Sequence, residues 1–308
     1  MKVIYRAKAR RRKGKTWRLC AFARILFSDM LKSMRGYIFF NGDIIAADEK
    51  LVGAGSRGLR YGEGVFETIR YVNGRAPLLP YHYERLMQGL QTLQFEVPAH
   101  FTASYILAAI EALCRKNELE QSARVRLNVC RGEKKETCVI METMPIPEGY
   151  DAFNEKGWKV DIYGEAKKSC DALSNLKSNN YLPYIMAAGY AKSRGLNDCL
   201  VLNSYERICD SSIANVFWVK NKQVFTPPLS EGCIAGVMRR YVIEKLREAG
   251  MPLEEKICTK QKLLQADEVF LTNALFGARW VEEFREKKYI NKLSAQLYKQ
   301  IVKPLFFR

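Results

Sequence analysis

The chain has 308 residues, 48% of them hydrophobic, and a formal net charge of +17 at pH 7. This length and composition can bury one large core or two moderate ones, and the lack of a long apolar run argues against a membrane span. Nine scattered cysteines without a Cys-x-x-Cys pair indicate reduced thiols in a cytoplasmic protein, and two histidines argue against a histidine-rich metal site.

The positive charge is concentrated in the first 35 residues, which hold twelve Lys or Arg against one acid, Asp29, and so contribute +11. The basic run 10–13 is typical of a phosphate-binding or targeting segment. It is equally consistent with a solvated tail or with an extension upstream of a start at Met34. We expect residues 1–33 to be a basic extension that is disordered or not native, and we do not expect nucleic acid as a partner.

A first α+β domain is expected over residues 34–144. Its predicted elements, in chain order, are a hairpin over 37–45 about Asn41-Gly42, a strand over 65–72 with a second hairpin resuming at Leu78, helices over 81–93 and 105–113, and strands over 124–129 and 137–141. The proline-rich stretch 144–149 breaks both periodicities and predicts a linker.

A second α+β domain is expected over residues 150–308. Its predicted elements are strands over 158–162, 199–202, 213–219 and 224–227, and helices over 182–193, 236–249 and 293–302. Clefts between domains are a preferred location for cofactor sites.

The chemistry of pyridoxal phosphate requires a lysine, an acid facing the ring nitrogen and an anion cradle. The sequence offers Lys177, Asp210, and Arg85 with Gly236. Taken singly, each has an ordinary alternative: a solvated lysine, a cap for the next serines, a surface arginine and a loop-to-helix junction. A dinucleotide-binding fingerprint is excluded at Gly62 and Gly64, because no helix follows them.

The order of four sequence blocks is more specific than any single residue. The blocks are LRYGEGVFETIR (59–70) with HYERL (82–86), KSNNYL (177–182), ICDSSIANVF (208–217), and FTPPL (225–229) with IAGVMR (234–239). From residue 37 to about 305, the chain resembles the class IV aminotransferase family, which includes branched-chain and D-amino-acid aminotransferases and aminodeoxychorismate lyase. The resemblance implies the two-domain α/β (α+β) fold of the D-amino-acid aminotransferase-like enzymes, a homodimer and pyridoxal 5'-phosphate as cofactor.

The resemblance also implies roles for individual residues. Lys177 would form the Schiff base, Arg85 would bind the phosphate, and the backbone N–H groups of Val237 and Met238, after Gly236, would complete the cradle. Tyr181 falls near the cofactor's phenolic oxygen, and Asp210 falls where the family usually has glutamate. Asn273 and Ala274 fall beside the phosphate, and Phe66, Thr68 and Arg70 are substrate-site candidates.

Two positions depart from the family pattern at the phosphate. Met238 stands where a threonine is common, and Ala274 stands where a second hydroxyl is common. The phosphate is therefore expected to depend more on Arg85 and on the start of the following helix.

The resemblance leaves the reaction open between members of the family. Glu133 follows Arg131-Gly132 where D-amino-acid aminotransferases carry an arginine, and an acid there would repel a substrate carboxylate. The stretch Thr272-Asn273-Ala274-Leu275 resembles the lyase-like members, although Asn273 alone could simply close a turn. We therefore favour aminodeoxychorismate lyase of folate biosynthesis, which expels pyruvate from an amino substrate and yields 4-aminobenzoate. The alternative is a branched-chain or other amino-acid aminotransferase, and a remote one is a catalytically inert protein that binds through its basic tail.

Overall fold

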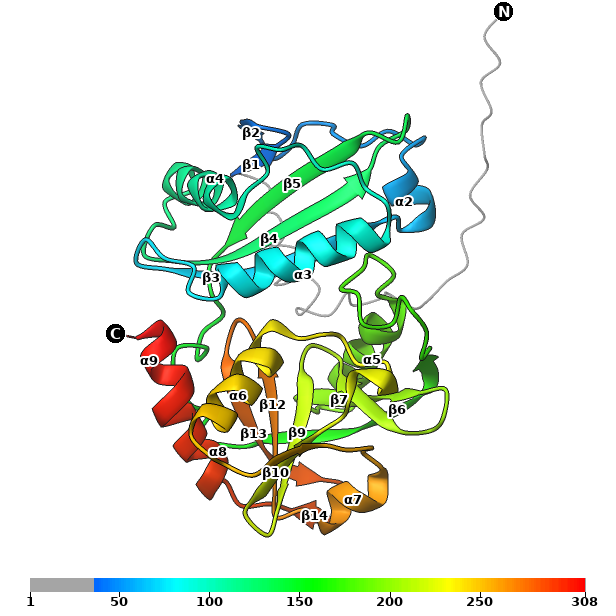
Figure 1. Cartoon of the computed structure of the whole chain (residues 1–308), viewed down its shortest axis with the longest axis vertical. Coiled ribbons are helices and arrows are strands. Elements are labelled where there is room, and N and C mark those ends of the chain that lie inside the picture. The colour runs from blue at the N-terminus through cyan, green and yellow to red at the C-terminus, as the bar shows by residue number, and fades with distance from the viewer. Residues whose placement is uncertain (1–35, 308) are drawn as a thin grey trace, which may run out of the picture.

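The computed structural model describes residues 36–307, so the expected basic extension lies outside the described residues. Two β-sheets form its framework, one from each half of the chain (Figure 1). The break between them falls in residues 145–157, which connect β5 to β6. The result is a mixed α/β structure in which the two halves face each other.

The first sheet is antiparallel throughout, with strand order β2-β1-β5-β4-β3. Its strands are β1 (Tyr37–Phe40), β2 (Asp43–Ala46), β3 (Gly64–Val72), β4 (Ser122–Arg131) and β5 (Thr137–Met144). The helices of this half are α2 (Arg57–Tyr61), α3 (Leu79–Thr92) and α4 (Ala103–Lys116). Val65 and Ile69 of β3 pack with Leu86 of α3 and Ile110 of α4 in one buried core. Because side chains alternate along a strand, Phe66, Thr68 and Arg70 project from the other face, toward the second sheet.

The second sheet has nine strands in the order β11-β10-β9-β12-β13-β6-β7-β8, with β14 paired to β13. Its strands are β6 (Trp158–Lys168), β7 (Asp198–Asn203), β8 (Ile208–Ser211), β9 (Asn215–Lys220), β10 (Gln223–Thr226), β11 (Leu253–Glu255), β12 (Glu268–Asn273), β13 (Gly277–Phe284) and β14 (Lys287–Lys288). An additional pairing of β8 with β9 closes six strands into a ring. Leu200, Val216, Leu271 and Val281 are fully buried in the core formed by these strands.

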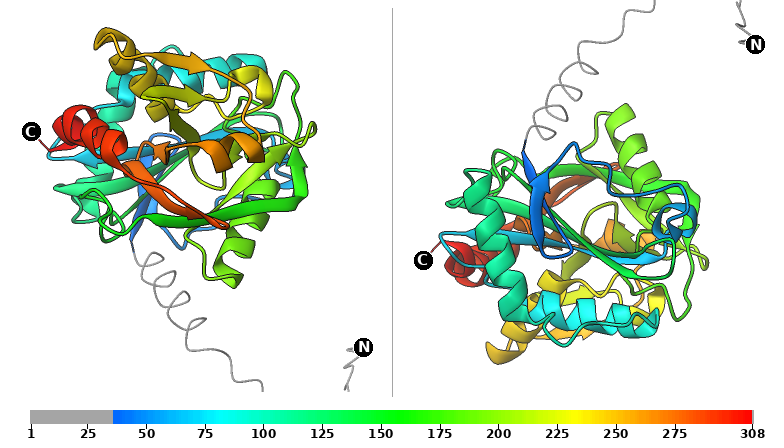
Figure 2. Two further views of the ribbon diagram at one scale, coloured as in Figure 1. Left: turned by 90° about the horizontal axis from the view of Figure 1, so that it is seen from below. Right: turned by 90° about the horizontal axis from the view of Figure 1, so that it is seen from above.

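The helices of the second half are α5 (Leu182–Ser193), α6 (Val237–Glu248), α7 (Lys260–Gln265), α8 (Lys292–Leu297) and α9 (Lys303–Phe306). Both views in Figure 2 show α5 projecting from the side of the molecule opposite to α3 and α6. Within residues 36–307, no helix is long and apolar enough to cross a membrane. The same residues contain no group of three or more His, Cys, Asp or Glu side chains arranged to hold a metal ion.

The local predictions differ in how well they match the structure. The hairpin over 37–45 and the helix over 182–193 are confirmed. The second hairpin is wrong: only Val72 and Arg75 form a bridge there, and α3 begins at Leu79, because Pro80 in its first turn favours a helix start. The strand expected over 213–219 begins only at Asn215, and the helix expected over 293–302 changes at Tyr298 into a wider helical turn.

Candidate active site

A cavity between the two halves of the chain collects nearly all of the predicted site residues. Its inner part, about 60 Å³, is lined by Thr68, Arg85, Lys177, Tyr181, Asp210, Gly236, Val237, Met238, Asn273 and Ala274, among others. An outer part of about 410 Å³ shares Thr68, Lys177, Tyr181 and Asn273 with it and adds Phe66. The two parts therefore adjoin, with Lys177 at their junction.

The backbone around Lys177 pairs with β3 of the first sheet, although Lys177 belongs to the second half of the chain. The N–H of Phe66 donates to the carbonyl of Lys177 at 2.9 Å, and the N–H of Asn179 donates to the carbonyl of Gly64 at 3.0 Å. The Lys177 Nζ lies 4.4 Å from the centroid of the Phe66 ring and 5.3 Å from that of Tyr181. Burial and the nearby Arg85 lower the pKa of Lys177 to about 7. A substantial fraction of the amine is thus uncharged near neutral pH, as a nucleophile must be.

This lowered pKa predicts how the cofactor-free protein reacts with an aldehyde such as pyridoxal phosphate. A depressed lysine pKa means that the neutral amine dominates above about pH 7, so the rate of covalent attachment should rise to about that pH and then level off. The rate can be followed by stopped-flow absorbance of the attached cofactor. A rate that keeps rising toward the pKa of an ordinary lysine, near about 10.4, would contradict the prediction.

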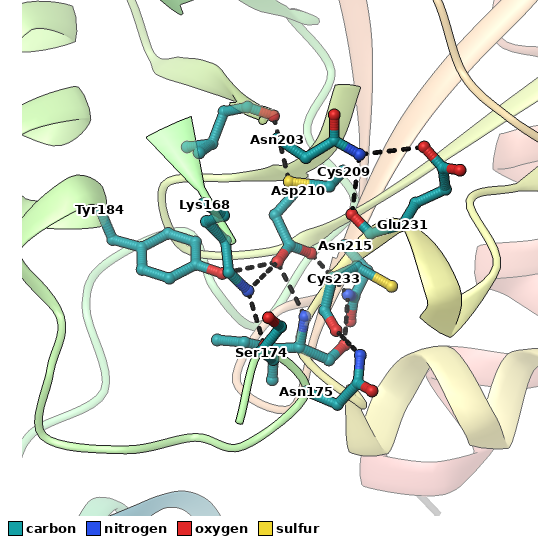
Figure 3. A network of polar contacts seen from close by, with 12 residues as sticks. Lys168, Ser174, Asn175, Tyr184, Asn203, Cys209, Asp210, Asn215, Glu231 and Cys233 are labelled. Atoms are coloured by element: carbon teal, nitrogen blue, oxygen red, sulfur yellow. Dashed lines mark hydrogen bonds and ion pairs between the residues drawn. The ribbon is translucent and has the colours of Figure 1, made fainter. Parts of the chain in front are cut away.

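Asp210 lies at the end of the inner cavity, in a network of donors (Figure 3). Its Oδ2 accepts hydrogen bonds from the Tyr184 hydroxyl at 2.7 Å and the Ile234 N–H at 2.9 Å, and the Lys168 Nζ lies 3.6 Å away. Its Oδ1 accepts one hydrogen bond from Asn215 Nδ2, at 2.8 Å. Burial raises the pKa of Asp210, and Lys168 and the hydrogen bonds oppose that rise. Oδ1 therefore keeps a free lone pair, the group needed to face a protonated ring nitrogen.

An anion cradle is formed where α3 meets the start of α6. Arg85 lines the inner cavity together with Gly236, Val237 and Met238, which begin α6. The first N–H groups of a helix lack intrahelical acceptors, and the helix dipole favours an anion there. A Cβ on Gly236 would lie 1.7 Å from the Asn215 Oδ1, so only glycine allows this close approach.

The departures from the family pattern are partly offset by a residue that the sequence reasoning missed. Met238 and Ala274 bring no hydroxyl to the cavity, but Thr272 also lines its inner part. The Thr272 Oγ1 is buried and has no protein hydrogen-bond partner. A buried hydroxyl without a partner is costly, so a ligand oxygen is a suitable acceptor for it.

Aromatic rings form the wall beside Lys177. Tyr181 stacks on Tyr184 with ring centroids 4.4 Å apart, and Phe66 meets the edge of Tyr181 at 5.3 Å. Burial and the negative charge of Asp210 raise the pKa of Tyr181, so its hydroxyl stays protonated and can donate a hydrogen bond.

Arg70 is not among the residues that line either part of the cavity, so the structure does not support its expected role as a substrate-site residue. Its guanidinium donates to the carbonyls of Tyr150, at 3.0 Å, and Leu275, at 2.5 Å, and pairs with Asp151. It also lies 4.6 Å from the ring centroid of Phe306. Arg70 is therefore committed to holding the connecting segment and the C-terminus against β3.

Two other arginines, Arg124 and Arg126 of β4, line the outer cavity instead. Both are cavity-facing because they alternate with Val125 and Leu127, which are buried on the helix side. The Arg126 guanidinium lies 4.1 Å from the Phe66 ring centroid, and the Arg124 Nε is buried without a partner. The alternation Arg-Val-Arg-Leu was the signal in the sequence that could have identified them.

Asn273 lines both parts of the cavity, but its side chain is used in the turn between β12 and β13. Its Oδ1 accepts hydrogen bonds from the N–H groups of Leu275 and Phe276, each at 3.0 Å. Its Nδ2 donates to the carbonyl of Ile213 at 3.2 Å. The stretch that resembles the lyases thus shapes this loop, and Asn273 closes the turn.

The side chains of the inner cavity fit pyridoxal phosphate. An amine with a lowered pKa, a buried carboxylate with a free lone pair, a guanidinium, a helix start and an unpartnered hydroxyl converge on one cavity. These are the groups that an aldehyde, a pyridine nitrogen and a phosphate require.

Comparisons with known proteins agree with this arrangement. Residues 64–284 match the sequence profile of the family described as Amino-transferase class IV. The aminodeoxychorismate lyase of Bacillus subtilis is 32% identical over 252 residues, which cover 77% of this chain and 83% of that protein. A putative branched-chain-amino-acid aminotransferase of Methanocaldococcus jannaschii is 27% identical over 274 residues, covering 86% of this chain and 93% of that protein.

Among solved structures, a branched-chain aminotransferase from Thermoproteus uzoniensis matches with a TM-score of 0.79 at 24% identity and covers 88% of this chain and 95% of that chain. This likeness confirms the expected fold. The profile match spans most of the described residues 36–307, including Lys177, Asp210 and the start of α6. The chain therefore belongs to the class IV aminotransferase family of pyridoxal-phosphate-dependent enzymes.

Proposed function

We propose that this protein is an aminodeoxychorismate lyase that uses pyridoxal 5'-phosphate bound through Lys177. The observation that carries the proposal is the pair Arg124 and Arg126, which line the outer cavity beside Lys177. Under this proposal the protein acts in the cytoplasm, in folate biosynthesis, on an amino derivative of chorismate.

The arginine pair suits the charge of this substrate. Pyruvate and 4-aminobenzoate each carry one carboxylate, so the molecule that yields both carries two. Guanidinium groups bind carboxylates with paired, directional hydrogen bonds, and the unpartnered Arg124 Nε has a donor to offer. A branched-chain amino acid would instead bring an apolar side chain to a wall that contains two cations. Arg126 lies 3.9 Å from the Glu142 carboxylate, whereas the buried Arg124 Nε has no partner, so an apolar group would leave this donor unsatisfied.

The residues of the inner cavity would hold the cofactor and move a proton. Arg85 and the first N–H groups of α6 would bind the phosphate, the Asp210 Oδ1 would face the ring nitrogen, and the Tyr181 hydroxyl would lie near the phenolic oxygen. When bound, pyridoxal phosphate supplies a ring that accepts electrons from the substrate. The Lys177 Nζ would take the proton from the carbon that bears the amino group, and as an ammonium it could then protonate the departing group.

An aminotransferase remains the second candidate, because branched-chain aminotransferases are also among the relatives. The two arginines would then bind a dicarboxylate such as 2-oxoglutarate. One assay separates the candidates: purified protein is given the chorismate-derived amine in one reaction and an amino acid with 2-oxoglutarate in another. We expect 4-aminobenzoate and pyruvate in the first, without any added keto acid. Amino-group transfer that depends on the keto acid, with no 4-aminobenzoate, would refute the lyase.

We further propose a homodimer that pairs through α5. Leu182, Ile185 and Met186 lie on one face of this helix and are 72%, 58% and 54% exposed. An apolar face of this kind marks an interaction surface, and Ile185 also lines the outer cavity, so a second copy would complete the substrate site.

This arrangement predicts that Ile185→Glu converts the dimer to a monomer, because it buries a charge in the contact. Analytical ultracentrifugation measures the change. Ile290→Glu is the matched control, since Ile290 is 54% exposed, close to the 58% of Ile185, but lies elsewhere. A wild-type protein that sediments as a monomer would contradict the dimer.

A further inference from the structure

A buried carboxylate, Glu67, lies behind the anion cradle on the helix-facing side of β3. It is 1% exposed and lines neither part of the cavity. Arg85 donates to it twice, from Nε to Oε1 at 2.8 Å and from Nη2 to Oε2, and the His82 Nδ1 lies 2.6 Å from Oε2. Glu67 therefore holds the one cationic side chain of the cradle from the side opposite to the ligand.

This contact fixes the direction in which Arg85 presents its remaining donors. A guanidinium has five N–H groups in a rigid plane. Glu67 takes the Nε–H and one N–H of Nη2, and the carbonyl of Ala235 takes one N–H of Nη1, at 2.9 Å. One N–H on each of Nη1 and Nη2 remains to bind an anion. Ala235 immediately precedes the start of α6, which joins the two parts of the cradle.

The charges around Glu67 favour this single arrangement. Burial would raise the pKa of Glu67, but Arg85 and His82 outweigh it and lower the pKa to about 2. Burial lowers the pKa of His82, so its ring is neutral and its Nδ1–H donates to the carboxylate, while its Nε2 has no partner. Glu67 thus stays ionised, and Arg85 is its only strong cationic partner among the described residues.

We propose that Glu67 is the positioning residue for the cofactor's phosphate: it holds Arg85 in the one orientation that meets an anion at the start of α6. The proposal rests on pyridoxal phosphate being the cofactor, as proposed above. Met238 and Ala274 supply no hydroxyl in this chain, so the phosphate would depend on Arg85, the start of α6 and the Thr272 hydroxyl. Without Glu67, the Arg85 side chain would recover its rotational freedom, and its guanidinium would no longer be held in the orientation that binds the phosphate.

The test compares two ligands that differ only in the phosphate. Cofactor-free Glu67→Gln protein is titrated with pyridoxal phosphate and with pyridoxal, following absorbance. We expect the Kd for pyridoxal phosphate to rise about tenfold or more, by analogy with the loss of a partner that orients a metal ligand, and the Kd for pyridoxal to change little. Glu63→Gln is the matched control, because Glu63 also pairs with two arginines, Arg57 and Arg131, outside the cavity. It should leave both constants unchanged.

A double-variant cycle tests whether Glu67 acts through Arg85. The loss of affinity in Glu67→Gln/Arg85→Lys should be no greater than in Arg85→Lys alone, since the orienting partner has nothing left to orient. Glu67→Asp keeps the charge and should recover part of the affinity. Circular dichroism shows whether Glu67→Gln folds. If Glu67→Gln does not fold, the affinity of Glu67→Asp tests the proposal instead.

Three outcomes would overturn the proposal. Equal losses for pyridoxal and pyridoxal phosphate would indicate general damage, and unchanged affinities would indicate that Arg85 needs no orientation. Wild-type protein that binds neither ligand would overturn the proposed function as well, whereas wild-type binding with an unaffected variant overturns the positioning role alone.

Discussion

Replacing Lys177 by alanine is expected to remove the visible absorbance of covalently bound cofactor and to lower kcat by about 10³-fold or more, because the same amine attaches the cofactor and moves the proton. Within residues 36–307, no other lysine lines either part of the cavity. Lys168, which pairs with Asp210, also donates to the carbonyl of Ser174. Its amine is therefore not free to substitute.

The measurements are the absorbance spectrum and steady-state rates in either assay described above. Lys167→Ala is the control, since Lys167 is partly exposed and pairs with Glu206 on the surface. A small amine added to the Lys177→Ala protein should restore part of the rate by supplying the missing base. Full activity in Lys177→Ala would show that this amine is not the catalytic base and would refute the proposed mechanism.

The substitution Asp210→Asn is expected to reduce kcat by about 10²-fold while changing the Kd for pyridoxal phosphate much less. The side chain keeps its size but loses the negative charge that would stabilise a protonated ring nitrogen. The ring would then accept electrons poorly, although Arg85 and α6 would still bind the phosphate. Activity and cofactor affinity, measured on the same preparation, separate these two effects.

Glu231→Gln is the matched control for Asp210→Asn. Glu231 is a buried carboxylate that accepts a hydrogen bond from Asn203 in the network of Figure 3. It also forms an ion pair with Arg207, and it does not line the cavity. If both variants lost activity to the same degree, the loss would report damage to the network rather than the charge at Asp210. An unchanged kcat in Asp210→Asn would remove Asp210 from the proposed site.

The local elements of the fold were largely predictable from sequence, because each carries its own signal. Asn41-Gly42 marks a hairpin, and the apolar spacing of 182–193 marks a helix, without reference to the rest of the chain. The ring of strands was not predictable in this way. It closes through a pairing of Asp210 in β8 with Asn215 in β9, and both strands are short and bounded by polar turns.

The site shows the same division between local and long-range information. The ordered blocks predicted which residues share a cavity, and alternation along β3 separates Phe66 and Thr68 from Glu67. The contacts of Arg70 could not be predicted from strand alternation, because its partners lie about 80 and 205 residues further along the chain. Glu67 was overlooked for a related reason, since its importance lies in a contact with a residue on a neighbouring helix.

The inner cavity is assembled from both halves of the chain, and this has a thermodynamic consequence. Arg85 reaches from α3 to the carbonyl of Ala235, and Lys177 is paired by its backbone to Phe66. A bound cofactor would contact both halves at once and would stabilise their association for as long as it stayed bound. Its binding free energy would then add to the cohesion of the two sheets, so loading and emptying the site would change how cooperatively the whole chain melts.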